Sequence, residues 1–291
     1  MALPKPGQKP VPKNGTGAGS GDEPTPNLPG QIAERRQVSN VKAPAFIRAE
    51  SDIKPRLIAN IQGPEGTGKD HMALEYSRGP IYVHSFDQGL DTVVQKFQHK
   101  REIYTAEYEL SMQPGDGTDK EVGQAANVVW EQFKSNLMDS YASTRKEGMV
   151  LVDTGTEVWE LLRLAYFGKL TQVMPHMYAK PNAEFREIVR EGFDACNVVW
   201  LHKMKDEWIN DEKGKGTRTG EKKYAGMNDI PFLVQVNVQT WHSVRESGVG
   251  LDFHATILDK CRPNPDLCGT ELDNNFQQLL EMVMASIGVA V

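Results

Sequence analysis

A glycine-rich heptapeptide is the stretch of this sequence whose residue types and spacing most directly suggest chemistry. The residues Gly63-Pro64-Glu65-Gly66-Thr67-Gly68-Lys69 fit the spacing G-x-x-x-x-G-K. Glycines let backbone N–H groups curl around an anion without Cβ clashes, and a lysine ammonium can reach the outer phosphate oxygens. The apolar run 57–61 comes before the heptapeptide, and a helical pattern that starts with Asp70 and His71 comes after it. An ordinary turn is the alternative, but this context favours phosphate binding by residues 63–71.

Asp70 departs from the usual pattern, because Ser or Thr would hold a magnesium ion at the position after the lysine. A carboxylate is also a hard oxygen ligand, but it adds negative charge beside the phosphates. Two outcomes stay open: an altered metal and nucleotide preference with slow hydrolysis, or binding without turnover. Asp70 could also simply suit the positive end of a helix.

Three further polar residues, Asp87, Asp153 and His202, each end an apolar run typical of a buried strand. Asp153 could hold magnesium, or it could cap the helix that follows. Asp87 could activate an attacking water as a general base, or it could cap a helix or solvate a turn. His202 could hydrogen-bond a γ-phosphate, or it could be an ordinary packed or solvated histidine.

A polar stretch, 203–224, follows the run that ends in His202. Residues 213–224 carry five positive charges and one negative charge, together with glycines and threonines. This composition predicts a mobile basic loop that contacts single-stranded nucleic acid or a neighbouring subunit's nucleotide, with a solvated surface loop as the alternative. Trp208 and Tyr224 could stack on bases or belong to the core.

The elements that must position these residues alternate along the chain. Hydrophobic patterns predict strands over 57–62, 81–86, 103–110, 149–154, 197–202, 234–241 and 253–259. They predict helices over 69–79, 90–97, 120–145, 158–166 and 182–195, and a C-terminal helix that carries Leu272 and Phe276. Such alternation indicates an α/β fold with a mainly parallel sheet, helices on both faces and antiparallel late strands. Right-handed crossovers would bring the glycine-rich loop, Asp87, Asp153 and His202 to one sheet edge.

Composition sets the boundaries of the folded part. Of the 291 residues, the first 44 include eight prolines and no aromatic residue. We therefore expect a disordered tail over 1–44 and one α/β domain over 45–291.

The remaining bulk properties favour a soluble protein in a reducing compartment. The net charge of −6 gives no global argument for nucleic-acid binding. The three cysteines lack C-x-x-C spacing, so neither a disulfide framework nor a zinc site is expected. The sequence contains no run of 18 apolar residues, and we expect no contact with a membrane.

In their order along the chain, these segments resemble those of the RecA-like P-loop ATPases. The resemblance is to the small phage-encoded nucleotide-binding proteins with an AAA domain that are linked to recombination and single-strand annealing, and it covers residues 53–259. Residues 63–69 resemble the Walker A motif, and 149–154 resemble the Walker B motif. Segment 85–91 places Asp87 where this family keeps its catalytic carboxylate. Segment 197–205 resembles the strand that ends in a polar sensor of the γ-phosphate. His202 stands at the sensor position, where glutamine is commoner in this family.

The resemblance implies ATP and Mg²⁺ as ligands and a homo-oligomer with ATP at its subunit interfaces. It assigns Lys69 to the β- and γ-phosphates, Asp153 to magnesium and Asp87 to the attacking water. Residues 203–223 would bind single-stranded DNA, and Lys222 or Lys223 would reach the adjacent subunit's nucleotide.

The implied setting is DNA recombination or annealing in the cytoplasm of a bacterial host, with the tail as a possible contact for a single-strand-binding protein. A nucleotide-gated assembly factor with little hydrolysis and another phage motor ATPase are the alternatives.

Overall fold

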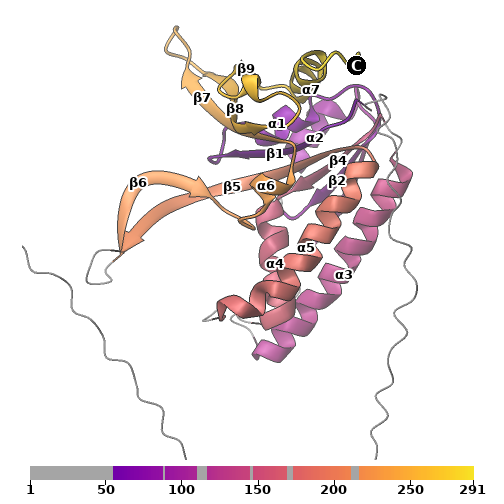
Figure 1. The fold of residues 1–291 in the computed structure, drawn as a ribbon, viewed down its shortest axis with the longest axis vertical. Helices are drawn as coiled ribbons and strands as arrows, with labels where there is room; N and C mark the ends of the chain where they lie inside the picture. Colours follow the sequence, from indigo (N-terminus) through magenta and orange to yellow (C-terminus); the bar gives the residue numbers. More distant parts are fainter. Residues whose placement is uncertain (1–54, 88, 110–116, 145–146, 169–172, 211–215) are drawn as a thin grey trace, which may run out of the picture. The chain divides into compact units, whose positions relative to one another are not determined.

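A nine-stranded sheet organises the part of the chain described by the computed structural model, namely residues 55–87, 89–109, 117–144, 147–168, 173–210 and 216–291. Its strands are β1 (Ile58–Gly63), β2 (Ile81–Ser85), β3 (Ile103–Glu107), β4 (Met149–Asp153), β5 (Asn197–Asn210), β6 (Gly216–Tyr224), β7 (Val236–Val244), β8 (Leu251–Cys261) and β9 (Glu271–Asp273) (Figure 1). The strand order is β3-β2-β4-β5-β1-β7-β8-β9, and β6 pairs with β5. All pairs from β3 to β7 are parallel, whereas β7–β8, β8–β9 and β5–β6 are antiparallel.

Helices cover both faces of this sheet. They are α1 (Lys69–Leu74), α2 (Asp91–Phe97), α3 (Asp119–Ser143), α4 (Gly155–Phe167), α5 (Ala179–Glu191), α6 (Ile230–Leu233) and α7 (Phe276–Ala285), with short 3₁₀ turns at Pro175–Tyr178, Gly192–Asp194 and Pro265–Leu267. The hydrophobic cluster on one face contains side chains from α1, α2 and α7, and the cluster on the other face contains side chains from α3, α4 and α5. The expected α/β architecture, a mainly parallel sheet with helices on both faces and antiparallel late strands, is confirmed.

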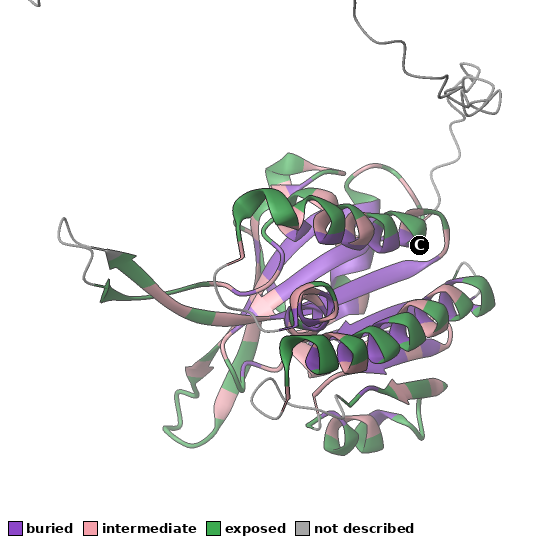
Figure 2. Cartoon of the chain, turned by 90° about the horizontal axis from the view of Figure 1, so that it is seen from below, coloured by how far each residue is buried: buried purple, intermediate pink, exposed green. Residues whose placement is uncertain are grey.

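Strand alternation explains how one sheet serves two cores. In β4, Met149 and Leu151 pack in the α1 cluster, whereas Val150 and Val152 pack in the α3 cluster. Successive side chains of a strand point to opposite faces, so an apolar run buried on both faces is what this position requires. β1 and β4 are buried along almost all of their length (Figure 2).

The prediction of a mobile basic loop over 213–224 was wrong for the described residues 216–224, which form β6. β5 continues to Asn210 and pairs with β6, so the two strands form an arm that extends from the sheet (Figure 1). We call β5 from residue 203 onward, together with β6, the arm. Its β-branched and aromatic residues, Trp208, Ile209, Thr217 and Thr219, favour strands more than the glycines and lysines of the stretch disfavour them. Lys213 and Lys215 lie outside the described residues.

Two smaller boundaries also differ from the prediction. The helix expected over 69–79 ends at Leu74, because Tyr76 turns into the core and its hydroxyl contacts the carbonyl of Glu147 and the amide of Asn197. Leu272 belongs to β9 and not to the C-terminal helix. The predicted tail over 1–44 lies outside the described residues and stays a prediction. None of the helices in the described ranges is long and apolar enough to cross a bilayer.

Candidate functional site

The glycine-rich loop links β1 to α1, and its backbone shape depends on glycine. Gly66 and Gly68 have φ angles of 74° and 76°, which residues with a side chain rarely adopt. At Gly63 a Cβ atom would collide with Thr240 and Thr67. A turn of this kind directs backbone N–H groups into a concave anion site. The two left-handed glycines give the loop a backbone shape of the kind that such sites use.

Lys69 folds back over this loop. Its Nζ donates to the carbonyl oxygens of Gly63 (3.1 Å) and Pro64 (3.0 Å). Burial lowers the pKa of Lys69, and the negative charges of Asp70 and Asp153 oppose this shift. The ammonium thus lies at the loop and can exchange two carbonyl partners for phosphate oxygens, with which its hydrogen bonds are stronger.

The fold brings Asp70, Asp87 and Asp153 close enough for their charges to interact. Asp153 is 4% exposed, and burial raises its pKa to about 8, with repulsion from Asp70 and Asp87 adding to the shift. Burial also raises the pKa of Asp70, which Asp87 raises further and Lys69 lowers. A divalent cation would offset this repulsion, because it is the largest local charge wherever it binds.

Two of these carboxylates fit the ligands that Mg²⁺ takes in nucleotide sites. Mg²⁺ prefers oxygen ligands and is usually held by one or two carboxylates together with phosphates and water. Asp70 and Asp153 supply such oxygens beside the loop. Over the described ranges, no group of three or more His, Cys, Asp or Glu side chains is placed to hold a metal ion.

The structure answers the alternative that Asp153 and Asp87 are helix caps. Thr154 is the N-cap of α4, and its hydroxyl accepts a backbone N–H at 3.3 Å. The N-cap position of α2 is occupied by Leu90. Asp87 Oδ2 lies 3.2 Å from Lys203 Nζ and forms an ion pair with it. The magnesium and catalytic roles of the two aspartates stay predictions.

Strand alternation decides which of the neighbours His202 and Lys203 faces the loop. Lys203 shares its face of β5 with Leu201, which packs in the α1 cluster. Asp153 is the register partner of Leu201, so it projects to that same face. His202 follows Trp200 onto the α3 face. Sequence reasoning did not find Lys203 as a site residue. Its positive charge opposes the rise in the pKa of Asp153 and adds to the fall that burial causes in the pKa of Lys69.

His202 is buried, away from these carboxylates. Its Nδ1 lies 2.7 Å from Asn60 Oδ1, and its ring centroid lies 4.8 Å from that of Tyr224. A Cβ on Gly155 would collide with its Nε2, which has no hydrogen-bond partner in the described part of the chain. Burial lowers the pKa of His202 to about 3, so the ring is neutral at physiological pH. Its γ-phosphate role stays a prediction.

Late segments of the chain hold the loop from the other side, and sequence reasoning did not find them. Thr67 Oγ1 lies 2.7 Å from Thr240 Oγ1, on β7. Asn274 Nδ2 donates to the carbonyl oxygen of Gly68 at 2.8 Å. These contacts join residues more than 170 positions apart, so no local pattern could have signalled them.

Two other predicted binding residues, Glu65 within the loop and His71 in α1, differ in their surroundings. Glu65 is exposed. The partly buried His71 ring meets Phe97 edge to face, with centroids 5.7 Å apart, and burial and Lys96 lower its pKa.

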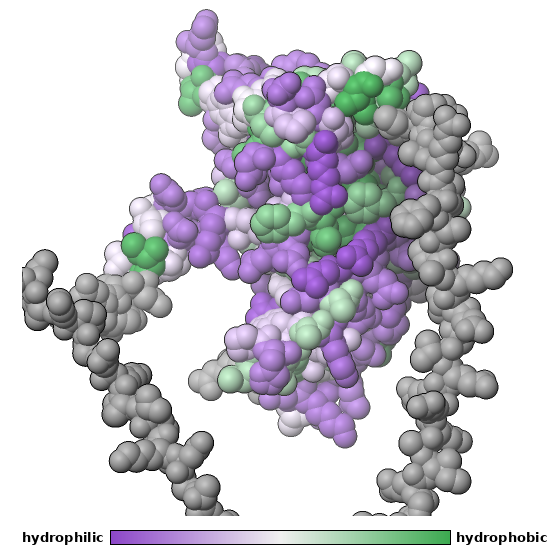
Figure 3. Space-filling model, in the orientation of Figure 1, coloured by the Kyte–Doolittle hydropathy of each residue, from purple (hydrophilic) through white to green (hydrophobic). Residues whose placement is uncertain are grey.

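The predicted trans-acting lysines lie on the arm. Lys222 is the register partner of Asp206, and Lys223 is the partner of Lys205. Trp208 is 58% exposed, whereas Tyr224 packs against His202. Figure 3 shows a mainly hydrophilic arm with a small hydrophobic patch near its outer end. Of the two aromatic residues that could stack on bases, only Trp208 is available to solvent.

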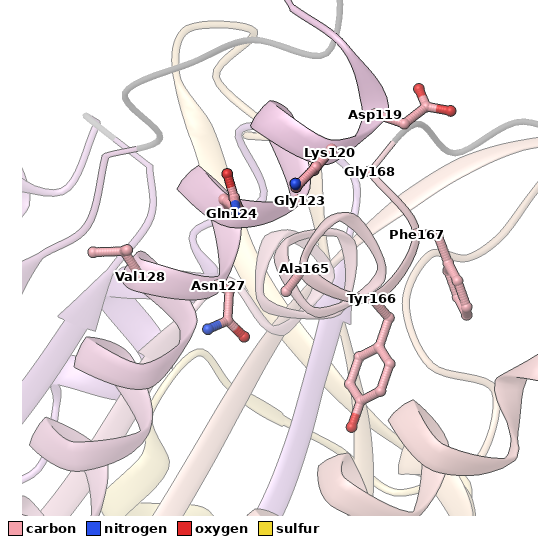
Figure 4. Close-up of a pocket in the computed structure, with 10 residues that line it drawn as sticks. All are labelled: Asp119, Lys120, Gly123, Gln124, Asn127, Val128, Ala165, Tyr166, Phe167 and Gly168. Atoms are coloured by element: carbon pink, nitrogen blue, oxygen red, sulfur yellow. The ribbon is translucent and has the colours of Figure 1, made fainter.

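Among the grooves lined by described residues, two adjoin α4. One, of about 720 Å³, lies between the start of α3 and the end of α4 (Figure 4). The other, also of about 720 Å³, lies between α4 and the base of the arm, and Lys203 lines it. Lys203, which lines the second groove, is the ion-pair partner of Asp87.

Comparisons with known proteins give similarity at the level of the backbone alone. No known protein family matches the chain, and no curated protein matches it. A prototypical ATPase from the type III secretion system of pathogenic bacteria aligns at 10% identity with a TM-score of 0.37, over 63% of this chain and 50% of that one. The assembled ATPase of the enteropathogenic E. coli type III secretion system aligns at 9% identity with a TM-score of 0.37, over 64% of this chain and 43% of that one.

An uncharacterised protein from Pyrococcus horikoshii aligns at 10% identity with a TM-score of 0.34, over 71% of this chain and 84% of that one. The chain thus spans half or less of the two secretion ATPases. Similarity at this level carries no argument about chemistry.

Proposed function

We propose that this protein binds ATP with Mg²⁺ where loop 63–69 meets Asp70, Asp87 and Asp153, and that it hydrolyses ATP slowly. The convergence of three separate segments, 63–70, Asp87 and Asp153, carries this proposal. The loop supplies anion-binding geometry, and the carboxylates supply oxygen ligands and a base. Burial raises the pKa of Asp153 to about 8, and the nearby charges of Asp70 and Asp87 add to this shift.

In the proposed reaction a water molecule attacks the γ-phosphorus of ATP. Lys69 holds the β- and γ-phosphate oxygens, and Asp70 and Asp153 would hold Mg²⁺, which supplies positive charge to the phosphates. Asp87 accepts a proton from the water as the new P–O bond forms. The bond from the γ-phosphorus to the bridging oxygen breaks, and that oxygen leaves on ADP with the electron pair.

A second candidate is a nucleotide-gated assembly factor with little turnover. Two observations favour it: Asp70 adds a partly buried carboxylate beside the loop, and Lys203 already pairs with Asp87. Replacing Asp70 with Thr separates the candidates. A large rise in hydrolysis supports the binding-only function of the natural protein, whereas a fall identifies Asp70 as a working magnesium ligand.

The finer proposal is that the arm binds single-stranded DNA within a homo-oligomer that supports phage recombination or annealing. The exposed Trp208 and the arm's lysines suit bases and phosphates respectively. Lys222 or Lys223 would contact ATP bound to the adjacent subunit, and the tail would contact a single-strand-binding protein. Translocation along duplex DNA would instead indicate another phage motor ATPase.

The test measures ATP binding by calorimetry and hydrolysis with and without single-stranded DNA. We expect Lys69→Ala to weaken ATP binding and to lower hydrolysis by about 10²- to 10³-fold. Lys134→Ala is the control. It also removes one lysine, but this lysine is on α3 and pairs with Glu131 and Glu184, which are not residues of the candidate site. A natural protein that binds no ATP, or a Lys69→Ala variant that binds it equally well, would refute the proposal.

A further inference from the structure

One ion pair joins the candidate hydrolytic carboxylate to the arm. Lys203 Nζ lies 3.2 Å from Asp87 Oδ2 and 2.8 Å from Glu157 Oε1. The backbone of Lys203 is fixed, because its N–H donates to Thr156 Oγ1 at 3.0 Å and its carbonyl accepts the N–H of Ala225 at 3.0 Å. Its side chain is 43% exposed. Lys203 can therefore exchange partners without any movement of the strand.

Two more lysines continue from Lys203 along one face of the arm. Lys203 and Lys205 are two positions apart in β5, so they share a face. Lys223 is the register partner of Lys205, and the β-bulge of the ladder comes only after Asp206. Lys222 is on the opposite face, as the partner of Asp206. We call Lys203, Lys205 and Lys223 the lysine row.

The lysine row is suited to a chain of phosphates. Like charges directly opposite in a ladder repel each other, as Lys205 and Lys223 do, and a polyanion would offset this repulsion. Its inner end opens into the groove of about 720 Å³ between α4 and the arm, which both Lys203 and Lys205 line. A phosphate backbone that follows the row would therefore end at the ammonium that pairs with Asp87.

We propose that Lys203 couples occupancy of the arm by single-stranded nucleic acid to the availability of Asp87, an inference that rests on the proposed function. In the free protein, Lys203 pairs with Asp87 and competes with the attacking water for this carboxylate. Phosphates bound along the lysine row draw the ammonium away. Asp87 is then free to take the water's proton, so nucleic acid stimulates hydrolysis by releasing one side chain.

The test uses nucleic-acid affinity, which reports the coupling without any turnover. If Asp87 and phosphate compete for Lys203, removing the charge of Asp87 must strengthen phosphate binding, because linkage is reciprocal. We measure the Kd of a fluorescent oligothymidylate by anisotropy for the natural protein, Asp87→Asn, Lys203→Met and the double variant. Asp87→Asn should tighten binding about two- to fivefold, the range for an exposed ion pair, and should have no effect when Lys203 is Met.

Asp252→Asn is the matched control, since it removes one negative charge and breaks an exposed ion pair, with Arg245 at 3.0 Å. It should leave the affinity unchanged. Equal tightening by Asp87→Asn with and without Lys203 would indicate a general charge effect and overturn the inference, and so would no tightening. A natural protein that binds no oligothymidylate would instead refute the nucleic-acid function itself.

Hydrolysis gives the second measurement. Lys203→Met should raise the rate without DNA towards the DNA-stimulated rate, so that the ratio of the two approaches one. A fall in both rates would make Lys203 a cation required for the reaction itself and would overturn the coupling.

Discussion

The two halves of β5 lie in different environments, although they form one strand. Residues 197–202 lie between β1 and β4 and are buried, whereas from Met204 onward the strand pairs with β6 and its residues are half-buried or exposed (Figure 2). Trp200 is fully buried in the inner half, and Trp208 is 58% exposed in the outer half. Burial of apolar surface stabilises the first half, and ladder hydrogen bonds hold the second. Stability and site geometry therefore depend on the inner half, while the outer half is free to bind.

The largest expected effect is on ATP hydrolysis, and it separates the sheet edge, which holds the proposed site, from the arm. Asp87→Asn removes the proposed base from the sheet edge and leaves the arm intact, so we expect ATP hydrolysis to fall about 10²- to 10⁴-fold. ATP binding should persist, because Lys69 and the loop are unchanged. Steady-state hydrolysis and calorimetric binding check this. An unchanged hydrolysis rate would remove Asp87 from the mechanism.

Trp200→Ala tests the inner half of β5. The ring is fully buried and lies 5.6 Å from that of Phe185, so its removal leaves a large cavity. We expect the free energy of unfolding to fall by about 3–5 kcal/mol, measured by urea denaturation. A loss of less than about 1 kcal/mol would contradict the assignment of this half to the core.

The next prediction concerns pH and a second buried residue of the core, His84 on β2. Its ring nitrogens lie 2.8 Å from Tyr108 Oη and 3.0 Å from Ser140 Oγ, and burial lowers its pKa to about 4. The unfolded state, in which the histidine pKa is about 6.5, binds more protons below that pH, so stability falls as pH decreases from about 6.5 to 4. The slope from this residue approaches about 1.4 kcal/mol per pH unit.

His84→Gln isolates this contribution, because all other titrating groups stay the same in both proteins. The variant should lose less stability than the natural protein between pH 6.5 and 4.5, whatever its stability at pH 7.5. Urea denaturation across that range measures both slopes, and parallel slopes would show that His84 takes up protons in the folded state.

The sequence could predict the positions at the ends of buried strands, but not the features that depend on tertiary structure. The loop, Asp87 and Asp153 each follow an apolar run, and parallel strands bring such ends to one edge, so these positions were predictable. Which of His202 and Lys203 faces the loop could not be predicted. A run that is buried on both faces is apolar throughout, so its pattern does not indicate which face α1 covers. Thr240 and Asn274 reach the loop only through tertiary structure. The arm was mistaken for a loop because its partner strand cannot be recognised from glycines and lysines alone.

The smallest expected effect on stability comes from Trp208→Ala, the counterpart of Trp200→Ala in the outer half. Because the ring is 58% exposed, its removal should change the free energy of unfolding by less than about 0.5 kcal/mol. Affinity for oligothymidylate should weaken about fivefold or more, since base stacking on an aromatic ring contributes roughly 1 kcal/mol or more. Denaturation and anisotropy on one preparation measure both. A stability loss as large as that of Trp200→Ala would mean that the arm is packed against another surface in solution, and the contrast between the two halves of β5 would no longer hold.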